Sequence, residues 1–117
     1  TWNDLIISWT PSAADSFTQR LLLKETTIWR PDIAVLNSLE QTQIISEDDR
    51  LAEVLADGTV FTTNPSVYDT WCRLNVSIYN NQQYPFSINI GSWVYTANET
   101  QITTNQTEIR LDVAGTV

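Results

Sequence analysis

The sequence contains no histidine, a single cysteine and a single lysine. Without histidine the chain lacks the commonest general base and the commonest metal ligand of proteins. The lone cysteine, Cys72, can form neither a zinc site nor an internal disulfide. Nucleophilic catalysis would then need a serine paired with lysine or a carboxylate, and Lys24 has no such motif around it. The sequence therefore predicts no enzyme, no catalytic residue, no metal and no cofactor.

Basic residues are also scarce. Six Lys and Arg stand against 14 Asp and Glu, giving a net charge of −8 and a pI near 4.1. The bases are scattered singly, at Arg20, Lys24, Arg30, Arg50, Arg73 and Arg110. Nucleic acid and anionic membranes are bound by clustered bases, so we expect neither as a partner. Long apolar runs are missing too, and nothing predicts a membrane span or a signal peptide. A chain of 117 residues fits one domain, 1–117.

The densest acidic run is Glu47-Asp48-Asp49. Its carboxylates could bind Ca²⁺, but the run lacks the Asp-x-Asp-x-Asp-Gly spacing of a specific calcium loop. We therefore expect a solvated loop here.

Hydrophobic residues recur with a period of two, which is typical of strands with one buried face. The alternating segments are 5–9, 71–78, 86–90 and 109–113. Asp57-Gly58 lies between two further β-prone segments and predicts a hairpin. Residues 19–24 could form one helical turn, although no partner face follows at the next turn. Strand signals at intervals of about ten to fifteen residues favour an all-β sandwich over a βαβ fold.

Three Asn-x-Ser/Thr sequences, at Asn75, Asn98 and Asn105, are potential N-glycosylation sites. A fourth asparagine, in Asn64-Pro65-Ser66, is excluded because proline blocks the acceptor conformation. Any one of the three can arise by chance in a chain so rich in Asn and Thr. Together they favour an extracellular, secreted glycoprotein.

Aromatic residues are abundant, with five Trp and four Tyr. Several lie at strand ends or loop entries, namely Trp29, Tyr68, Trp93 and Tyr95. One interpretation makes them core and rim residues of a sandwich. The other makes Trp93 and Tyr95 a surface for a cationic ligand, because aromatic faces attract cations. Composition alone leaves both open.

The order and spacing of six short motifs resemble one family, the extracellular ligand-binding domains of Cys-loop receptors. This family includes the nicotinic acetylcholine receptors and the soluble acetylcholine-binding proteins. The motifs are Trp2-Asn3-Asp4, Trp9-Thr10-Pro11, Ile28-Trp29-Arg30-Pro31-Asp32-Ile33, Asp57-Gly58-Thr59-Val60, Cys72 and Gly91-Ser92-Trp93-Val94-Tyr95. The resemblance covers almost the whole chain. It implies an immunoglobulin-like β-sandwich that is the protomer of a ring-shaped pentamer, with ligand sites between subunits. It also implies a partial domain, which the family extends before Trp2 and, through a capping hairpin, after Val117.

On the principal face of the ligand site, the resemblance assigns Trp29, Pro31 and Asp32 to a loop in which the Trp and Asp chiefly support structure. Trp93 matches the central tryptophan of the aromatic cage, and Tyr95 follows it. Leu36 stands where the cholinergic pattern has a cage tyrosine. We therefore expect a cationic, choline-like ligand that is bound more weakly than is usual in the family.

On the complementary face, the resemblance places Glu53, Phe61 and Thr63 along the other wall. The complementary-face tryptophan of the family is expected to precede Thr1. The site would then be completed only between two copies of the chain, and we expect a homo-pentamer.

The signature loop begins at Cys72, and Phe86 occupies the position of the second cysteine. We expect a buried, reduced Cys72 thiol packed near Phe86. The loop tip, 79–85, is polar and lacks the membrane-docking sequence of the channels. This favours a secreted acetylcholine-binding protein. The alternatives are a divergent channel subunit at the plasma membrane and an assembly subunit with no ligand of its own. An adhesion or lectin-like sandwich would leave the ordered motifs unexplained.

Overall fold

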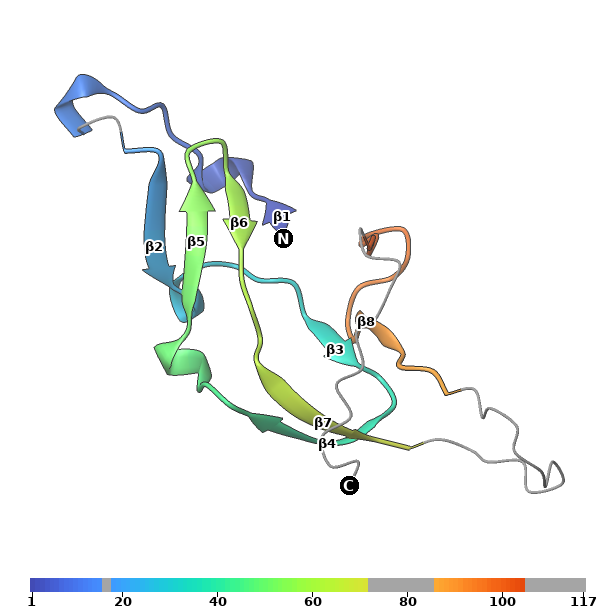
Figure 1. Ribbon diagram of the computed structural model, residues 1–117. Helices are drawn as coiled ribbons and strands as arrows, with labels where there is room; N and C mark the ends of the chain where they lie inside the picture. Colours follow the sequence, from blue (N-terminus) through green and yellow to red (C-terminus); the bar gives the residue numbers. More distant parts are fainter. Residues whose placement is uncertain (16–17, 72–85, 105–117) are drawn as a thin grey trace, which may run out of the picture.

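Short antiparallel strands make up the protein in the computed structural model, which describes residues 1–15, 18–71 and 86–104 (Figure 1). The strands are β1 (Trp2–Asn3), β2 (Arg20–Lys24), β3 (Ile33–Val35), β4 (Ser38–Gln43), β5 (Leu51–Leu55), β6 (Thr59–Phe61), β7 (Ser66–Thr70) and β8 (Ile90–Ser92). Four single turns of 3-10 helix join them: η1 (Leu5–Ile7), η2 (Ala13–Asp15), η3 (Glu25–Thr27) and η4 (Glu47–Asp49). No α-helix occurs within those ranges, and the predicted all-β class is confirmed.

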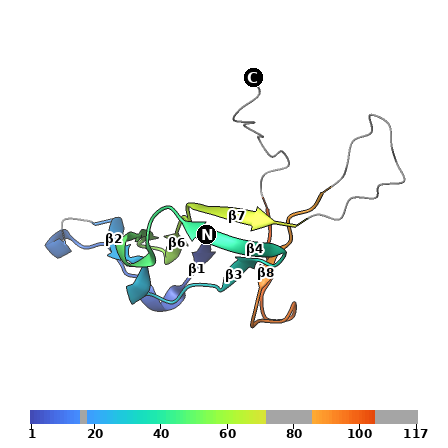
Figure 2. The same cartoon turned by 90° about the horizontal axis from the view of Figure 1, so that it is seen from below.

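The strands form three separate sheets. One has four strands in the order β1-β6-β5-β2, and the other two are the ladders β3-β8 and β4-β7. Every pairing is antiparallel. Figures 1 and 2 show the four-stranded sheet at one side and the two ladders together at the other.

The hairpin between β5 and β6 is confirmed. Gly58 has a φ of 88°, a left-handed conformation that favours glycine. Its N–H donates to the Leu55 carbonyl at 2.9 Å, while the Asp57 carboxylate accepts from the Thr59 N–H at 2.9 Å. The Gly58 carbonyl accepts from the Asp4 N–H at 2.8 Å, so the tight turn also anchors the start of the chain.

The core lies on one face of the four-stranded sheet. Ala52, Val54 and Val60 are its buried hydrophobic residues among those described. Alternation along β5 turns Ala52 and Val54 inward and leaves Glu53 between them on the other face. Five partly buried residues pack around this core, namely Trp2, Ile7, Trp9, Leu23 and Ile28.

Two local predictions in the first 24 residues need correction. The segment 5–9 is not a strand, because Asp4 accepts a hydrogen bond from the Ile6 N–H at 3.0 Å and starts η1 instead. A short side chain that bonds the backbone in this way competes with strand pairing. Ile6 is consequently 93% exposed. The possible helical turn at 19–24 is wrong as well, since β2 pairs with β5 over Arg20–Lys24.

The predicted strand over 86–90 is also mostly wrong, because β8 begins only at Ile90. Phe86, Ile88 and Ile90 alternate with polar residues in the sequence, yet all three are exposed in the structure, Phe86 by 60%. The described residues supply no layer that covers these side chains. The predicted strand over 109–113 and all but Trp71 of the segment 71–78 fall outside the described residues.

Candidate functional site

The turn after β8 carries Trp93 and is held by a carboxylate. The Ser92 hydroxyl donates to one oxygen of Asp32 at 2.6 Å, and the Val94 N–H donates to the other at 2.9 Å. The Ser92 oxygen in turn accepts from the Tyr95 N–H at 2.8 Å. Hydrogen bonds from Ser92 first, and then from backbone N–H groups, lower the pKa of Asp32. We call this arrangement the Asp32 clamp.

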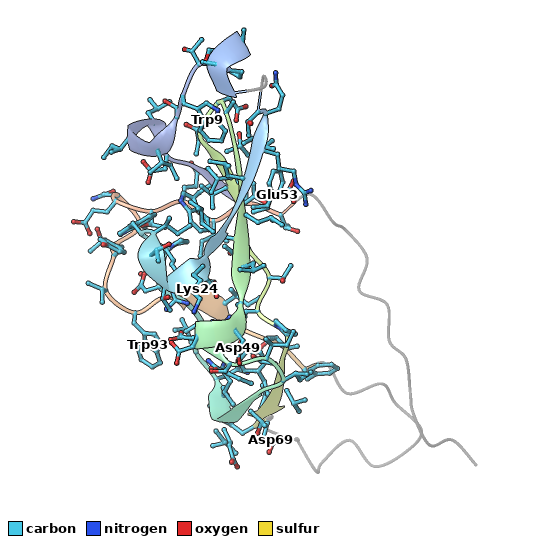
Figure 3. All side chains as sticks on the ribbon, turned by 90° about the vertical axis from the view of Figure 1, so that its left-hand side faces the viewer. Trp9, Lys24, Asp49, Glu53, Asp69 and Trp93 are labelled. Carbon is cyan, nitrogen blue, oxygen red and sulfur yellow. The ribbon has the colours of Figure 1, made fainter. Side chains whose placement is uncertain are left out.

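The Asp32 clamp leaves the Trp93 side chain in solvent. Trp93 is 71% exposed and Tyr95 is also exposed, so neither is a core residue of this chain. In Figure 3 Trp93 projects away from the ribbon. A fixed turn that presents an exposed indole can offer its face to a cation.

Leu36 lies in the turn between β3 and β4. Because Ile33 pairs with Ser92 and Val35 with Ile90, Leu36 and Trp93 flank opposite ends of the β3-β8 ladder. The Leu36 N–H donates to the Asn89 carbonyl at 2.7 Å, which continues the pairing of Val35 with Ile90. Its side chain lies over Gly91, because a Cβ built on Gly91 would be 3.0 Å from the Leu36 Cδ1. The structure therefore brings Leu36 and the strand that leads to Trp93 into contact.

Two residues assigned to the complementary wall, Glu53 and Phe61, lie on the four-stranded sheet, and the third, Thr63, lies just beyond it. Glu53 and Phe61 are direct cross-strand partners, and their side chains point away from the core. Phe61 is 42% exposed, and Thr63 follows it in an exposed position. Arg20 forms an ion pair with Glu53 at 2.5 Å. This partner partly neutralises the carboxylate that would attract a cation.

The two sets of residues do not meet within one chain. Trp93, Tyr95 and Leu36 flank the β3-β8 ladder, whereas Glu53, Phe61 and Thr63 belong to the β5-β6 hairpin and the residues after it. Figure 1 shows these sheets on different sides of the molecule. A site that contains both sets would have to form between two copies.

Other predicted residues have simpler placements. Trp29 is half exposed and packs edge-to-face against Trp2, with ring centroids 6.1 Å apart. Pro31 is half-buried, and Asn98 is exposed in a turn. Cys72, Asn75 and Asn105 fall outside the described residues, and so does the expected contact between Cys72 and Phe86.

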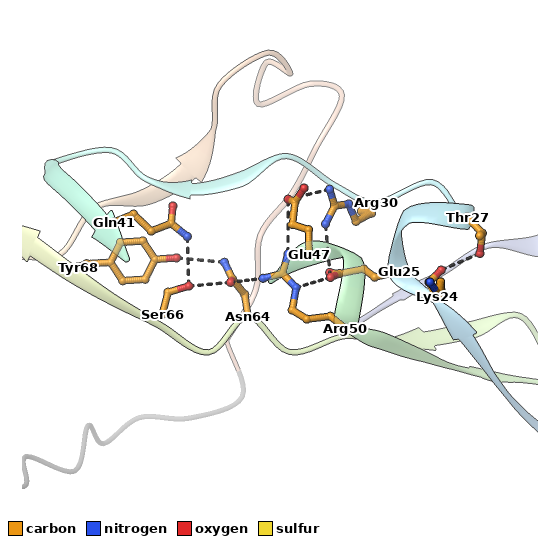
Figure 4. A network of polar contacts seen from close by, with 10 residues as sticks. All are labelled: Lys24, Glu25, Thr27, Arg30, Gln41, Glu47, Arg50, Asn64, Ser66 and Tyr68. Atoms are coloured by element: carbon orange, nitrogen blue, oxygen red, sulfur yellow. Dashed lines mark hydrogen bonds and ion pairs between the residues drawn. The ribbon is translucent and has the colours of Figure 1, made fainter. Parts of the chain in front are cut away.

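A group of charged residues joins the four-stranded sheet to the segment before β3 (Figure 4). We call Glu25, Arg30, Glu47 and Arg50 the charge cluster. Glu25 and Arg50 are only 4% and 6% exposed, and they form an ion pair at 2.5 Å. Glu47 accepts from Arg30 at 2.9 Å, so the prediction of a merely solvated acidic loop is wrong for this residue.

The charge cluster continues into the loop between β6 and β7. Arg50 also donates to Asn64, whose amide donates to the Tyr68 hydroxyl at 3.2 Å. A cavity of about 460 Å³ opens beside the cluster, between Trp2, Pro31 and Thr62. Sequence reasoning missed this cluster because its four members are separated by up to 25 residues and are brought together only by the pairing of β2 with β5.

The model of the neurotransmitter-gated ion-channel ligand binding domain matches residues 1–115. The alpha-3 subunit of the neuronal acetylcholine receptor of Carassius auratus is 28% identical over 94 residues, which is 80% of this chain and 18% of that subunit. The beta-type acetylcholine receptor subunit lev-1 of Caenorhabditis elegans is 28% identical over 111 residues, 95% of this chain and 20% of that subunit. The chain thus spans about a fifth of these relatives.

A solved structure gives a matching fold. The Capitella teleta AChBP in complex with lobeline superposes with a TM-score of 0.61 and 26% sequence identity, over 84% of this chain and 43% of that one. This likeness confirms the predicted β-sandwich class. In the part of the chain that the structure describes, no helix is long and apolar enough to cross a membrane.

Proposed function

Since the chain belongs to the neurotransmitter-gated ion-channel ligand-binding domain family, we propose that it binds a small, choline-like organic cation at the boundary between two of its copies. The membership agrees with the resemblance read from the motifs, and it makes the chain a binding domain rather than an enzyme.

The observation that carries the proposal is the exposed Trp93 on a turn fixed by the Asp32 clamp. An indole face attracts an ammonium group through its quadrupole, by about 2 kcal/mol or more once the contact is desolvated. Tyr95, on the same turn, adds a second aromatic surface.

The second copy supplies the other wall. Its Phe61, Glu53 and Thr63 face solvent on the four-stranded sheet, where they could pack against Trp93 of the first copy. Leu36 offers no aromatic ring, and Arg20 competes for the Glu53 carboxylate. Both features make the site weaker and less selective for quaternary ammonium than an all-aromatic cage with a free carboxylate.

A homo-pentamer that is extracellular, secreted and glycosylated completes the proposal. Asn98 is exposed, as an acceptor of glycan must be. The alternatives are a channel subunit at the cell surface, which would bind the same ligand, and an assembly subunit without its own ligand, which the binding experiment below distinguishes.

The test is calorimetric titration of the assembled protein with choline. We expect Trp93→Ala to abolish binding and Trp93→Phe to leave a weakened remnant, because a phenyl ring has the weaker quadrupole. We expect Leu36→Tyr to tighten binding by roughly 0.5–2 kcal/mol, provided that its ring reaches the cation.

Trp71→Ala is the matched control, since Trp71 is another exposed tryptophan, directly follows β7 of the neighbouring β4-β7 ladder and takes no part in the Asp32 clamp. It should bind choline as the parent does. Equal binding by Trp93→Ala and the parent would refute the site. No response of the assembled parent to choline would instead favour the assembly subunit.

A further inference from the structure

The charge cluster is rooted in the four-stranded sheet. Glu25 directly follows β2, and Arg50 directly precedes β5. The Glu25 N–H donates to the Arg50 carbonyl at 3.0 Å, which extends the ladder of these strands to the cluster itself. Removing one partner of such a buried ion pair leaves an uncompensated charge, so the pair resists rearrangement.

Arg30 attaches the segment before β3 to this rigid pair (Figure 4). One terminal nitrogen of Arg30 donates to Glu47 at 2.9 Å, and the other lies 3.4 Å from Glu25. Partial burial acts to lower the pKa of Arg30, but the hydrogen bonds and charges of Glu47 and Glu25 outweigh it and raise the pKa. Arg30 therefore stays charged at any physiological pH.

The two residues after this attachment cannot flex freely. Pro31 fixes its own φ near −65°. It also confines the residue before it, Arg30, to extended conformations. Asp32 comes next and holds Ser92 and Val94 through the Asp32 clamp. A short, stiff connection thus runs from the four-stranded sheet to the turn of Trp93.

We propose that Arg30 is a positioning residue that sets the place of the Trp93 turn relative to the sheet carrying Phe61 and Glu53. In a ring of identical copies, this position determines the distance between Trp93 of one copy and the Phe61 and Glu53 side chains of the neighbouring copy. The effect of Arg30 on ligand binding rests on the proposed function. The positioning of the Trp93 turn by Arg30 concerns a single chain and does not.

The experiment uses the assembled protein with 5-fluorotryptophan at all five tryptophans. Each fluorine resonance is assigned by a Trp→Phe variant. The test variant is Arg30→Gln, and Glu47→Gln is the milder second variant, because Glu47 is more exposed than Glu25. Arg30→Lys keeps the charge, but a single ammonium group cannot contact Glu25 and Glu47 in the way that the two terminal nitrogens of a planar guanidinium do.

Lys24→Gln is the matched control, because it removes one positive charge from an exposed residue outside the charge cluster. Trp9 reports on the fold, since its side chain packs on the core and its indole N–H donates to the Thr18 carbonyl at 2.9 Å. We expect the Trp93 resonance to shift or broaden in Arg30→Gln and Glu47→Gln, and less in Arg30→Lys. The Trp9 resonance should stay in place in all variants.

Choline titration is the second readout. Arg30→Gln should bind roughly two- to thirty-fold more weakly, the range seen for residues that act through a packed network. Arg30→Lys should be intermediate, and Lys24→Gln should bind as the parent does.

The two readouts separate the possible failures. An unchanged Trp93 resonance in Arg30→Gln and Glu47→Gln overturns the positioning role, whatever choline does. A shifted Trp93 resonance with unchanged choline affinity shows that Arg30 positions the turn, but overturns the proposed effect of this positioning on binding. If the parent binds no choline at all, the proposed function fails, whereas the Trp93 resonance still decides whether Arg30 positions the turn.

Discussion

The two carboxylates near the candidate site, Asp32 and Glu53, have different roles. Both oxygens of Asp32 accept hydrogen bonds from its own ladder, so this carboxylate organises structure. Glu53 lies on the outer face of β5 and is paired with Arg20, whose side chain is 57% exposed against 34% for Glu53. Because an exposed ion pair is weak, Glu53 can exchange Arg20 for another cation at little cost.

The pKa of Asp32 gives a prediction with a definite sign. Because this pKa is lowered in the folded protein, the clamp contributes stability above the unfolded value of about 3.9. That contribution is lost as pH falls through the lower, folded pKa. Choline binding by the parent should therefore drop at a pH below about 4.

Asp32→Asn should bind more weakly than the parent at pH 7, because an amide nitrogen replaces one of the two acceptor oxygens. Its affinity should lack the acidic step attributed to Asp32. Titrating both proteins by intrinsic fluorescence from pH 7 to pH 3 measures the difference. Identical profiles would mean that the Asp32 clamp does not govern the Trp93 turn.

At the level of elements, the β5-β6 hairpin depends on one glycine. Gly58 combines a left-handed φ with close backbone contact, since an added Cβ would lie 2.5 Å from the Asp4 carbonyl oxygen. Gly91, on β8, has no left-handed φ and meets only the flexible Leu36 side chain. The chain thus offers two glycines in different environments.

We expect Gly58→Ala to lower the free energy of unfolding by on the order of 1–3 kcal/mol, from backbone strain alone. Displacement of Asp4 adds to this loss. Gly91→Ala is the control and should cost less, because Leu36 can move aside. Urea denaturation of the assembled proteins compares the two. Equal midpoints would show that the turn tolerates a side chain and that the hairpin is less constrained than its geometry indicates.

For the whole molecule, the small core is the main constraint. The described residues bury only Ala52, Val54 and Val60 among their hydrophobic side chains. Large apolar residues on all three sheets remain exposed, including Leu22, Leu39 and Ile90. Apolar surface of this extent favours association, and the short edge strands leave backbone groups unpaired.

We therefore expect the mass of a pentamer in solution, measured by light scattering at micromolar concentration. The melting temperature should rise with protein concentration, because association stabilises the folded chain by mass action. A folded monomer with a melting temperature independent of concentration would contradict this expectation.

Local sequence signals predicted those features that depend on few residues. Asp57-Gly58 indicated its hairpin because a tight turn needs a left-handed residue there. The alternation in 5–9 wrongly predicted a strand, since a hydrophobic pattern with a period of two gives no sign that Asp4 caps a 3-10 turn. The motif around Trp93 led to the family, but its role in ligand binding stays a prediction.

The charge cluster shows what sequence reasoning could not reach. Glu25 and Arg50 become partners only because Lys24 pairs with Leu51 across two strands. The register of distant strands decides such a contact, and a single sequence gives no direct signal for it.

The hydrogen bonds of Asn64 limit which residues can replace Pro65 in the loop between β6 and β7. The Asn64 amide is already engaged, because its oxygen accepts from Arg50 and from Ser66 and its nitrogen donates to Tyr68. With any residue other than proline at position 65, the sequence Asn64-x-Ser66 would become a signal for glycan attachment. In a secretory pathway the glycosylating enzyme would then compete with folding for the same nitrogen. In such a pathway Pro65 prevents glycosylation of Asn64, and so preserves the hydrogen bonds of the loop between β6 and β7.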